Sequence, residues 1–394
     1  MNSPASETPS TNLSQQPPNL GGAAGRFRPT WAEVSTGAFS ANLRAFRALV
    51  GAGTRIMAVL KADAYGHGAV ALAPAAIQAG ADAIGVSSIE EGRALRDAGV
   101  NAPILLLGGV YPLENFAAVL ESRLTPTVAS LESAHKLSAI AAAAGRSVSF
   151  HLKVDTGMGR LGVSPAGARA VLKLVVAQNT LRLTGVYSHF ASADSDAEFT
   201  SQQLAEFISL RAFAKSLGFP DAVFHIANSA AALSVPDARL DMIRPGIAIY
   251  GAPTVALPTG MALQPVLTWR TKIVFIKRVP AGTTISYGRR FRTDREMEVA
   301  TLPVGYADGV PRAVFGKGQA LVKGARRPIL GVVTMDHVML DVTGAGVDVG
   351  EDVVLIGRQG GAEITASDWA AWAGTISYEI FCGISKRVPR EVVA

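Results

Sequence analysis

Strand-like and helix-like segments alternate along the first two thirds of the chain. Eight apolar or β-branched runs recur between residues 55 and 250, and the segments between them are rich in Ala, Leu and Glu with helical spacing. The eight runs are RIMAVLK, AIGVSS, PILLLG, TPTV, VSFHLKVD, LTGVYSH, VFHIAN and MIRPGIAIY. Because parallel strands need helical crossovers, eight such units predict a (β/α)8 TIM-type barrel. An open, doubly wound parallel sheet is the alternative architecture.

The pattern changes after about Pro258 to alternating strands with tight turns, and helix-forming segments nearly vanish before ASDWAAWAG. We therefore expect an α/β chain with an N-terminal barrel over residues 28–258 and a mostly antiparallel β domain over residues 259–394. A strand expected near residues 30–35 precedes the barrel and can join the β domain. Residues 1–27, rich in Ser, Pro, Gln and Asn, are expected to form a disordered tail.

Composition restricts the class of function. Hydrophobic residues make up 49% of the chain, enough for a large core, and the Lys and Arg residues are scattered without interleaved aromatics, so nucleic acid is not an expected partner. No run reaches the roughly 18 apolar residues of a membrane helix, and the start of the chain lacks the features of a signal peptide. We therefore expect a cytoplasmic protein without membrane contact.

The chain has one cysteine, Cys382. A single cysteine excludes intramolecular disulfides and cysteine-based zinc or redox motifs, and its apolar neighbours favour a small buried side chain. No HExxH motif is present either, so no metal site is predicted.

Polar residues collect at and after the ends of the predicted strands, where a barrel carries its active site. Each has an ordinary structural explanation on its own: a lysine that reaches the rim, a core histidine, or an ion pair between Arg244 and Asp241. Their common position on one rim instead predicts a functional site. The residues are Lys61, Lys153, Asp155, Arg160, His189, His225, Asn228, Ser229, Arg244, Gly246 and Ile247.

A lysine at such a rim, with its pKa lowered by a low-dielectric surrounding, is suited to forming a Schiff base. The Ser229 hydroxyl and the backbone N–H groups of Gly246 and Ile247 lie in the last two loops, where barrels commonly bind phosphate. A Schiff-base lysine combined with a phosphate site predicts the cofactor pyridoxal 5'-phosphate (PLP).

From Trp31 to the C-terminus the chain resembles the bacterial alanine racemases, a PLP-dependent family of fold type III. The motifs that carry the resemblance are VLKADAYGHG, VDTGMGRLG, HFASAD, HIANSAA, IRPGIAIYG, ISYGRRF, LPVGYADG, TMDHVMLDVT and ISYEIFCGI. The resemblance implies an isomerase that interconverts L-alanine and D-alanine through a PLP aldimine and two-base proton transfer. It also implies a role in supplying D-alanine for peptidoglycan.

The resemblance further implies a role for each matching residue. Lys61 would carry the cofactor and act as one base, and Tyr287 from the other subunit of a homodimer would be the second base at a shared active site. His189 would link Tyr287 to the positive Arg244, which faces the pyridine nitrogen. The other implied positions are Tyr65, Arg160, Ser229, Gly246, Ile247 and Tyr378 around the cofactor, Arg160, Met335, Asp336 and Tyr306 around the substrate, and Lys153 as a possible carbamylated lysine.

Other functions stay open at this point. A broad-specificity or serine-type amino-acid racemase would share these residues, although crowding by Tyr287, Tyr378 and Met335 favours a methyl-sized side chain. A non-catalytic PLP-binding protein shares the barrel and its lysine but lacks a β domain that supplies Tyr287. A decarboxylase of the same fold type usually has an acidic residue near the pyridine nitrogen, where this chain has Arg244.

Overall fold

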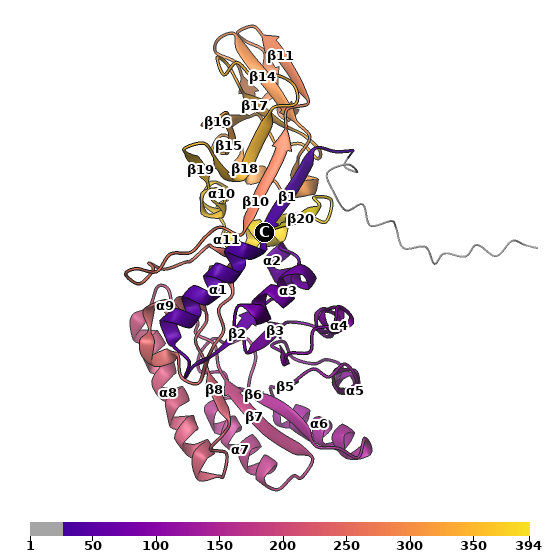
Figure 1. Cartoon of the computed structure of the whole chain (residues 1–394), viewed down its shortest axis with the longest axis vertical. Coiled ribbons are helices and arrows are strands. Elements are labelled where there is room, and N and C mark those ends of the chain that lie inside the picture. The colour runs from indigo at the N-terminus through magenta and orange to yellow at the C-terminus, as the bar shows by residue number, and fades with distance from the viewer. Residues whose placement is uncertain (1–26) are drawn as a thin grey trace, which may run out of the picture.

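The computed structural model describes residues 27–394, which form a barrel and a β domain stacked along the long axis of the molecule (Figure 1). The predicted disordered tail over residues 1–27 lies outside the described residues, apart from Phe27. The barrel strands are β2 (Arg55–Val59), β3 (Ala83–Val86), β4 (Ile104–Leu106), β5 (Thr127–Val128), β6 (Val148–Lys153), β7 (Leu181–Tyr187), β8 (Val223–His225) and β9 (Met242–Ile243).

Hydrogen bonds close these eight parallel strands into a barrel. Two four-stranded parallel sheets form, in the orders β4-β3-β2-β9 and β5-β6-β7-β8. They join on one side at a parallel bridge between Leu105 and Thr125. On the other side the backbone N–H of Arg244 donates to the carbonyl of Ala227 at 2.9 Å. The prediction of a barrel is confirmed, and the open sheet is excluded because both edges are paired.

Helices cover the outside of the barrel strands, and polar side chains fix where most of them begin. The side chain of the residue before each of α1, α4, α6, α7, α8 and α9 accepts a hydrogen bond from a backbone N–H of the first turn, as expected for an N-cap. The helices are α1 (Thr36–Val50), α2 (Lys61–Gly66), α3 (Ala69–Gln78), α4 (Ile89–Asp97), α5 (Phe116–Glu121), α6 (Leu131–Ala143), α7 (Pro165–Val176), α8 (Ala197–Ser216) and α9 (Ser229–Ser234).

Strand β6 shows how the barrel positions polar groups. Successive side chains of a strand point to opposite faces. Phe150 and Leu152 therefore pack in the apolar core, whereas His151 contacts His225 and Lys153 lies over the ring of Tyr187. The face of β6 that points into the barrel thus carries two polar side chains, those of His151 and Lys153.

The β domain is built on a ten-stranded sheet in the order β11-β14-β17-β16-β15-β18-β10-β1-β20, with β19 paired to β18. Strand β1 (Thr30–Ser35) pairs antiparallel with β10 and parallel with β20, so the first strand of the described chain belongs to this sheet. The other strands are β10 (Leu267–Lys272), β11 (Phe275–Val279), β14 (Met297–Leu302), β15 (Gln319–Val322), β16 (Ala325–Leu330), β17 (Val338–Asp341), β18 (Asp352–Gln359), β19 (Ala362–Ile364) and β20 (Arg390–Val393), with a separate ribbon of β12 (Thr284–Ile285) and β13 (Phe291–Arg292).

Two helices, α10 (Ala366–Ala373) and α11 (Ser377–Gly383), complete the β domain, and α11 was not expected from the sequence. Helix α11 packs against α2 of the barrel, where the ring of Phe381 lies 4.8 Å from the ring of His67. The prediction of a buried Cys382 is wrong, because α11 turns Ile380 and Phe381 inward and leaves the cysteine exposed.

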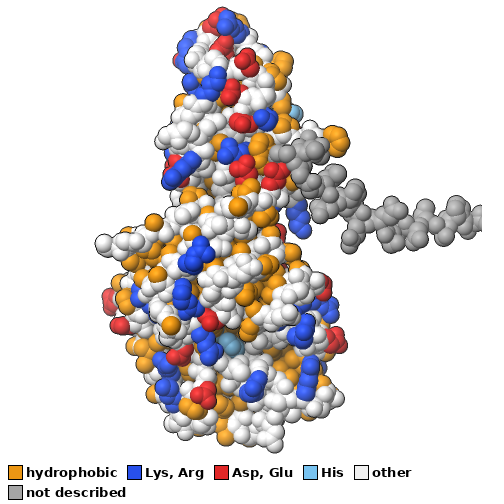
Figure 2. Space-filling view, viewed as in Figure 1, with side chains coloured by type: hydrophobic (Ala, Val, Ile, Leu, Met, Phe, Trp, Pro, Cys, Tyr) orange, Lys and Arg blue, Asp and Glu red, His pale blue; other side chains and the backbone are white. Residues whose placement is uncertain are grey.

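Across the described residues, no helix combines the length and the apolar composition that crossing a membrane requires. On the face shown in Figure 2, Lys and Arg side chains are interspersed with Asp and Glu over both domains.

Candidate active site

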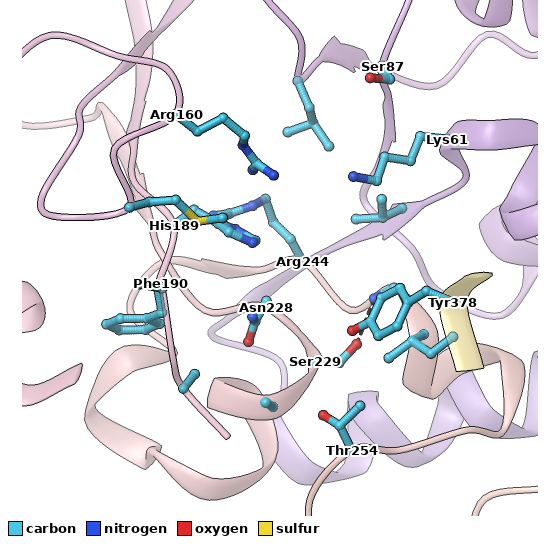
Figure 3. A pocket seen from close by; sticks show the side chains of 18 of the residues that line it. Lys61, Ser87, Arg160, His189, Phe190, Asn228, Ser229, Arg244, Thr254 and Tyr378 are labelled. Atoms are coloured by element: carbon cyan, nitrogen blue, oxygen red, sulfur yellow. Dashed lines mark hydrogen bonds between the residues drawn. The ribbon is translucent and has the colours of Figure 1, made fainter. Parts of the chain in front are cut away.

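The loops that follow the barrel strands enclose a cavity of about 680 Å³. Figure 3 shows Lys61 and Arg160 pointing toward each other across it, with Ser229 and Tyr378 close together at one side. Of the residues predicted from the sequence, those that line the cavity are Lys61, Tyr65, Lys153, Arg160, His189, Asn228, Ser229, Arg244, Gly246, Ile247 and Tyr378.

Two other predicted residues, Asp155 and His225, do not line this cavity in the described chain. Four more do not line it and lie on the β domain: Tyr287, Met335, Asp336 and Tyr306. The Tyr287 side chain is 72% exposed and that of Met335 is 51% exposed. The loops of Tyr306 and Met335 are joined to each other, since the N–H of Ala307 donates to the carbonyl of Met335 at 3.1 Å. These residues therefore form a surface of the β domain.

Lys61 begins α2, two residues beyond the end of β2, and the next four residues have a left-handed backbone. Ala62, Asp63, Ala64 and Tyr65 have φ angles between 52° and 55°. Each such residue costs about 1–2 kcal/mol relative to a right-handed conformation, so the surroundings must hold the turn in place. The turn brings both Lys61 and Tyr65 to the cavity.

Three side chains hold this left-handed turn. Glu91 accepts a hydrogen bond from the N–H of Ala62 at 2.7 Å, and Asp63 accepts one from the N–H of Ala69 at 2.7 Å. The buried His67 has its Nδ1 atom 3.0 Å from the carbonyls of Ala64 and Tyr65. Because carbonyls only accept, Nδ1 carries the proton.

The cavity is strongly cationic. Burial, followed by the charge of Arg160, lowers the pKa of Lys61. Burial, followed by the charges of Arg244 and Arg160, lowers the pKa of Lys153 to about 7. The nearby Asp155 uses its carboxylate to accept hydrogen bonds from the backbone of residues 157 and 159. An anionic ligand suits such a site. The lowered pKa values also raise the fraction of each lysine that is present as the neutral, nucleophilic amine.

At one end of the cavity, hydroxyls and backbone amides form a cradle. The Ser229 hydroxyl oxygen accepts from the N–H groups of Gly246 at 2.8 Å and Ala248 at 3.3 Å. The Tyr65 hydroxyl lies against Gly246, where a Cβ atom would meet it at 2.4 Å. Within residues 27–394 the hydroxyls of Tyr65 and Tyr378 have no hydrogen-bond partner, which leaves them available to a phosphate.

Arg244 is buried beneath the cavity and does not pair with Asp241, so that structural explanation is excluded. Its guanidinium donates to Ser188 O at 2.7 Å and lies 3.0 Å from His225 Nδ1 and 3.3 Å from His189 Nδ1. Asp241 instead pairs with Arg211. Burial, followed by the charge of Arg244, places the pKa of His189 well below its ordinary value, so His189 is neutral.

Tyr187 also lines the cavity and was not identified from the sequence. Lys153 Nζ lies 4.9 Å from the centroid of its ring, and the guanidinium of Arg244 lies 5.4 Å from it. The Tyr187 hydroxyl donates to the carbonyl of Leu107 at 3.0 Å. A signal was present, because Tyr187 is the last residue of β7 and so lies at the strand end, where a barrel carries its active site.

Comparisons with known proteins agree with this architecture. Residues 34–254 match the family model for the alanine racemase N-terminal domain, and residues 266–392 match the model for the C-terminal domain. The chain is 47% identical to an alanine racemase of Symbiobacterium thermophilum and 45% identical to that of Halothermothrix orenii, in each case over 92% of this chain and 97% of the relative.

Solved structures give the same result. The crystal structure of alanine racemase from the D-cycloserine producer Streptomyces lavendulae superposes with a TM-score of 0.88 at 38% identity, covering 94% of this chain and 98% of that one. Alanine racemase from Bacillus anthracis, solved with bound L-Ala-P, superposes with a TM-score of 0.87 at 36% identity, covering 94% of this chain and 96% of that one.

Proposed function

The chain belongs to the alanine racemase family, and we propose that it interconverts L-alanine and D-alanine in the cavity of its barrel. Enzymes of this family are PLP-dependent isomerases, and supply of D-alanine for peptidoglycan is their general role. The observation that carries the proposal is one cavity that holds Lys61 together with the cradle of Ser229, Gly246 and Tyr65.

The residues present fit PLP. A hydroxyl and amide cradle suits its phosphate, and the cradle is tight enough that a Cβ on Gly246 would occupy it. Tyr65, Ser229, Gly246, Ile247 and Tyr378 would hold the phosphate. Lys61 would bind the aldehyde, Arg160 the phenolic oxygen and Arg244 the pyridine nitrogen. When bound, PLP withdraws electrons from the substrate α-carbon and so acidifies its C–H bond.

Racemisation needs one base on each face of the substrate α-carbon. Lys61 is one base in this proposal, and its lowered pKa supports that role. The second is Tyr287 of the partner in a homodimer with shared active sites. The exposure of Tyr287 and Met335 on the β domain supports this arrangement. There Tyr287 would meet His189, while Met335, Asp336 and Tyr306 would border the substrate.

We propose that Lys153 is carbamylated. Its pKa of about 7 supports this, because only a neutral amine adds to carbon dioxide. The addition forms an N–C bond and releases one proton, which gives a carbamate anion opposite Arg160. We also propose a cytoplasmic location, which is compatible with the free, exposed thiol of Cys382.

The reaction is tested by incubating the protein with PLP and L-alanine in heavy water. Chiral chromatography measures D-alanine, and NMR measures deuterium at the α-carbon. Wild type and the control Lys215→Ala, an exposed lysine on α8, are expected to form deuterated D-alanine, whereas Lys61→Ala forms none. Cofactor binding without inversion of alanine would contradict the proposal, and inversion of serine instead would identify another amino-acid racemase.

A further inference from the structure

A pair of histidines lies in the interior of the barrel, below the cavity. His151 on β6 and His225 on β8 are 9% and 0% exposed, and His151 Nδ1 lies 2.9 Å from His225 Nε2. Apolar side chains fill the barrel interior: Met57, Ala83, Leu105, Val223 and Met242. Neither imidazole is among the described residues that line the cavity. A buried polar pair in apolar surroundings is costly unless its hydrogen bonds are made.

The barrel is shaped to hold this pair. Gly185 on β7 lies opposite His151, and a Cβ atom there would stand 2.5 Å from the His151 ring. The ring of Tyr187 stacks on that of His225 with an interplanar angle of 7° and a centroid distance of 5.0 Å. Both imidazoles are therefore fixed in place by their neighbours.

The proton positions follow from Arg244, because a guanidinium has only donors. Arg244 Nη1 lies 3.0 Å from His225 Nδ1, so that nitrogen must accept. His225 then carries its proton on Nε2 and donates it to His151 Nδ1. The direction of both hydrogen bonds is thus set, and His151 supplies the final acceptor.

We propose that His151 is a positioning residue that acts through His225 to hold the Arg244 guanidinium in its orientation beneath the cavity. The inference rests on the proposed role of Arg244 toward the pyridine nitrogen. Without an acceptor at the Nδ1 position of residue 151, the Nε2–H of His225 is left unpaired in the barrel interior. The other tautomer of His225 does not restore the hydrogen bonds, since its Nδ1–H would point at the N–H groups of Arg244.

Two variants with γ-branched side chains separate the positioning role of His151 from an effect on packing. His151→Asn keeps an acceptor oxygen near the Nδ1 position, and His151→Leu removes it. Histidine-selective ¹⁵N labelling of the PLP-loaded protein reports which ring nitrogen carries the proton, and the chain has only six histidines to assign. We expect the Nε2–H tautomer of His225 in wild type and in His151→Asn, and a mixture of tautomers in His151→Leu.

Alanine kinetics give the second readout. We expect kcat to fall about tenfold in His151→Leu with KM within about twofold of wild type, and His151→Asn to restore most of kcat. Met57→Leu is the matched control, because it changes an apolar neighbour in the same interior at nearly constant volume and leaves the polar pair intact.

The outcomes separate this inference from the proposed function. A His225 proton on Nδ1 in wild type overturns the positioning role, even if His151→Leu yields no folded protein. Equal spectra and equal kcat in the Asn and Leu variants overturn it too. A changed tautomer in His151→Leu with unchanged kcat would instead contradict the proposed role of Arg244, and the positioning role with it.

Discussion

The hydroxyl of Tyr65 lies so close to Gly246 that a Cβ atom on residue 246 would stand 2.4 Å from the hydroxyl oxygen. Gly246→Ala must therefore displace Tyr65 from the proposed phosphate site. We expect PLP affinity to fall at least about tenfold, which is about 1.4 kcal/mol. Titration of the apoprotein with PLP, followed by absorbance, measures this. Gly109→Ala is the control, since its Cβ would meet Leu161 at an ordinary 3.5 Å, and equal affinities in the two variants would refute the cradle.

The proposed sharing of active sites between the subunits of a homodimer predicts complementation. Lys61→Ala and Tyr287→Phe are each expected to be inactive as homodimers. A heterodimer of the two has one intact site, formed by Lys61 of one chain and Tyr287 of the other. Equal mixtures, unfolded and refolded together, should therefore recover about a quarter of wild-type activity. A mixture as inactive as its components would show that both bases come from one chain.

The left-handed turn after Lys61 predicts an unusual response to glycine. Ala62 has φ of 53° and is exposed, so Ala62→Gly relieves an unfavourable backbone conformation and should stabilise the protein by about 0.5–1 kcal/mol. Ala94→Gly, at an exposed position of the right-handed helix α4, should destabilise it by about 1 kcal/mol. Urea unfolding of the apoproteins measures both. Destabilisation by both substitutions to a similar extent would contradict the strain assigned to the turn.

Buried neutral histidines predict a loss of stability in acid. Burial lowers the pKa of His67 to about 4 and that of His151 to about 3. Below pH 6.5 the unfolded chain takes up protons that the folded chain does not, so the stability present above that pH is lost as the pH falls. Each histidine lowers the unfolding free energy by about 1.4 kcal/mol for each pH unit of acidification, until the pH reaches the pKa of that histidine in the folded protein.

His151→Asn removes one of these groups, so the unfolding free energy of the variant should fall less steeply with acidification. The difference in slope should approach about 1.4 kcal/mol per pH unit, which corresponds to one proton taken up on unfolding. Urea unfolding at several pH values between about 7 and 5 compares the slope with that of wild type. Identical slopes would mean that His151 does not stay neutral in the folded protein.

Lys153 is expected to take up carbon dioxide as the pH rises through about 7, because its amine becomes neutral there. A carbamate signal in ¹³C NMR of protein equilibrated with labelled bicarbonate measures this uptake. Lys153→Gln should lack the signal, and Arg160→Gln should weaken it by removing the neighbouring positive charge. A signal of equal size in Lys153→Gln would place the modification elsewhere.

The sequence allowed the barrel and much of the cavity to be predicted, for a physical reason. The carboxyl ends of parallel strands meet at one rim, so Lys61, Lys153, His189 and Arg244 could be placed together from strand order alone. Tyr287 could not be placed in this way, because it follows no barrel strand and lies on the β domain.

Two local features had no usable sequence signal. Residues 62–65 contain no glycine, yet they form the left-handed turn, since a distant contact from Glu91 and a local one from the buried His67 outweigh the preference of the backbone. The short helix α11 is also set by tertiary contacts with α2, so the exposure of Cys382 could not be read from its apolar neighbours.

The pairing of β1 with β10 and β20 has a consequence for the order of folding. During synthesis β1 emerges first, but its neighbours in the sheet emerge only after the whole barrel has been made. The barrel can therefore assemble on the ribosome while β1 is still unpaired. The sheet of the β domain is completed only after β20 has been synthesised. Removing β20 would leave one edge of β1 without its partner, so deletion of residues 390–393 should impair the folding of β1, a strand on the far side of the barrel in the sequence.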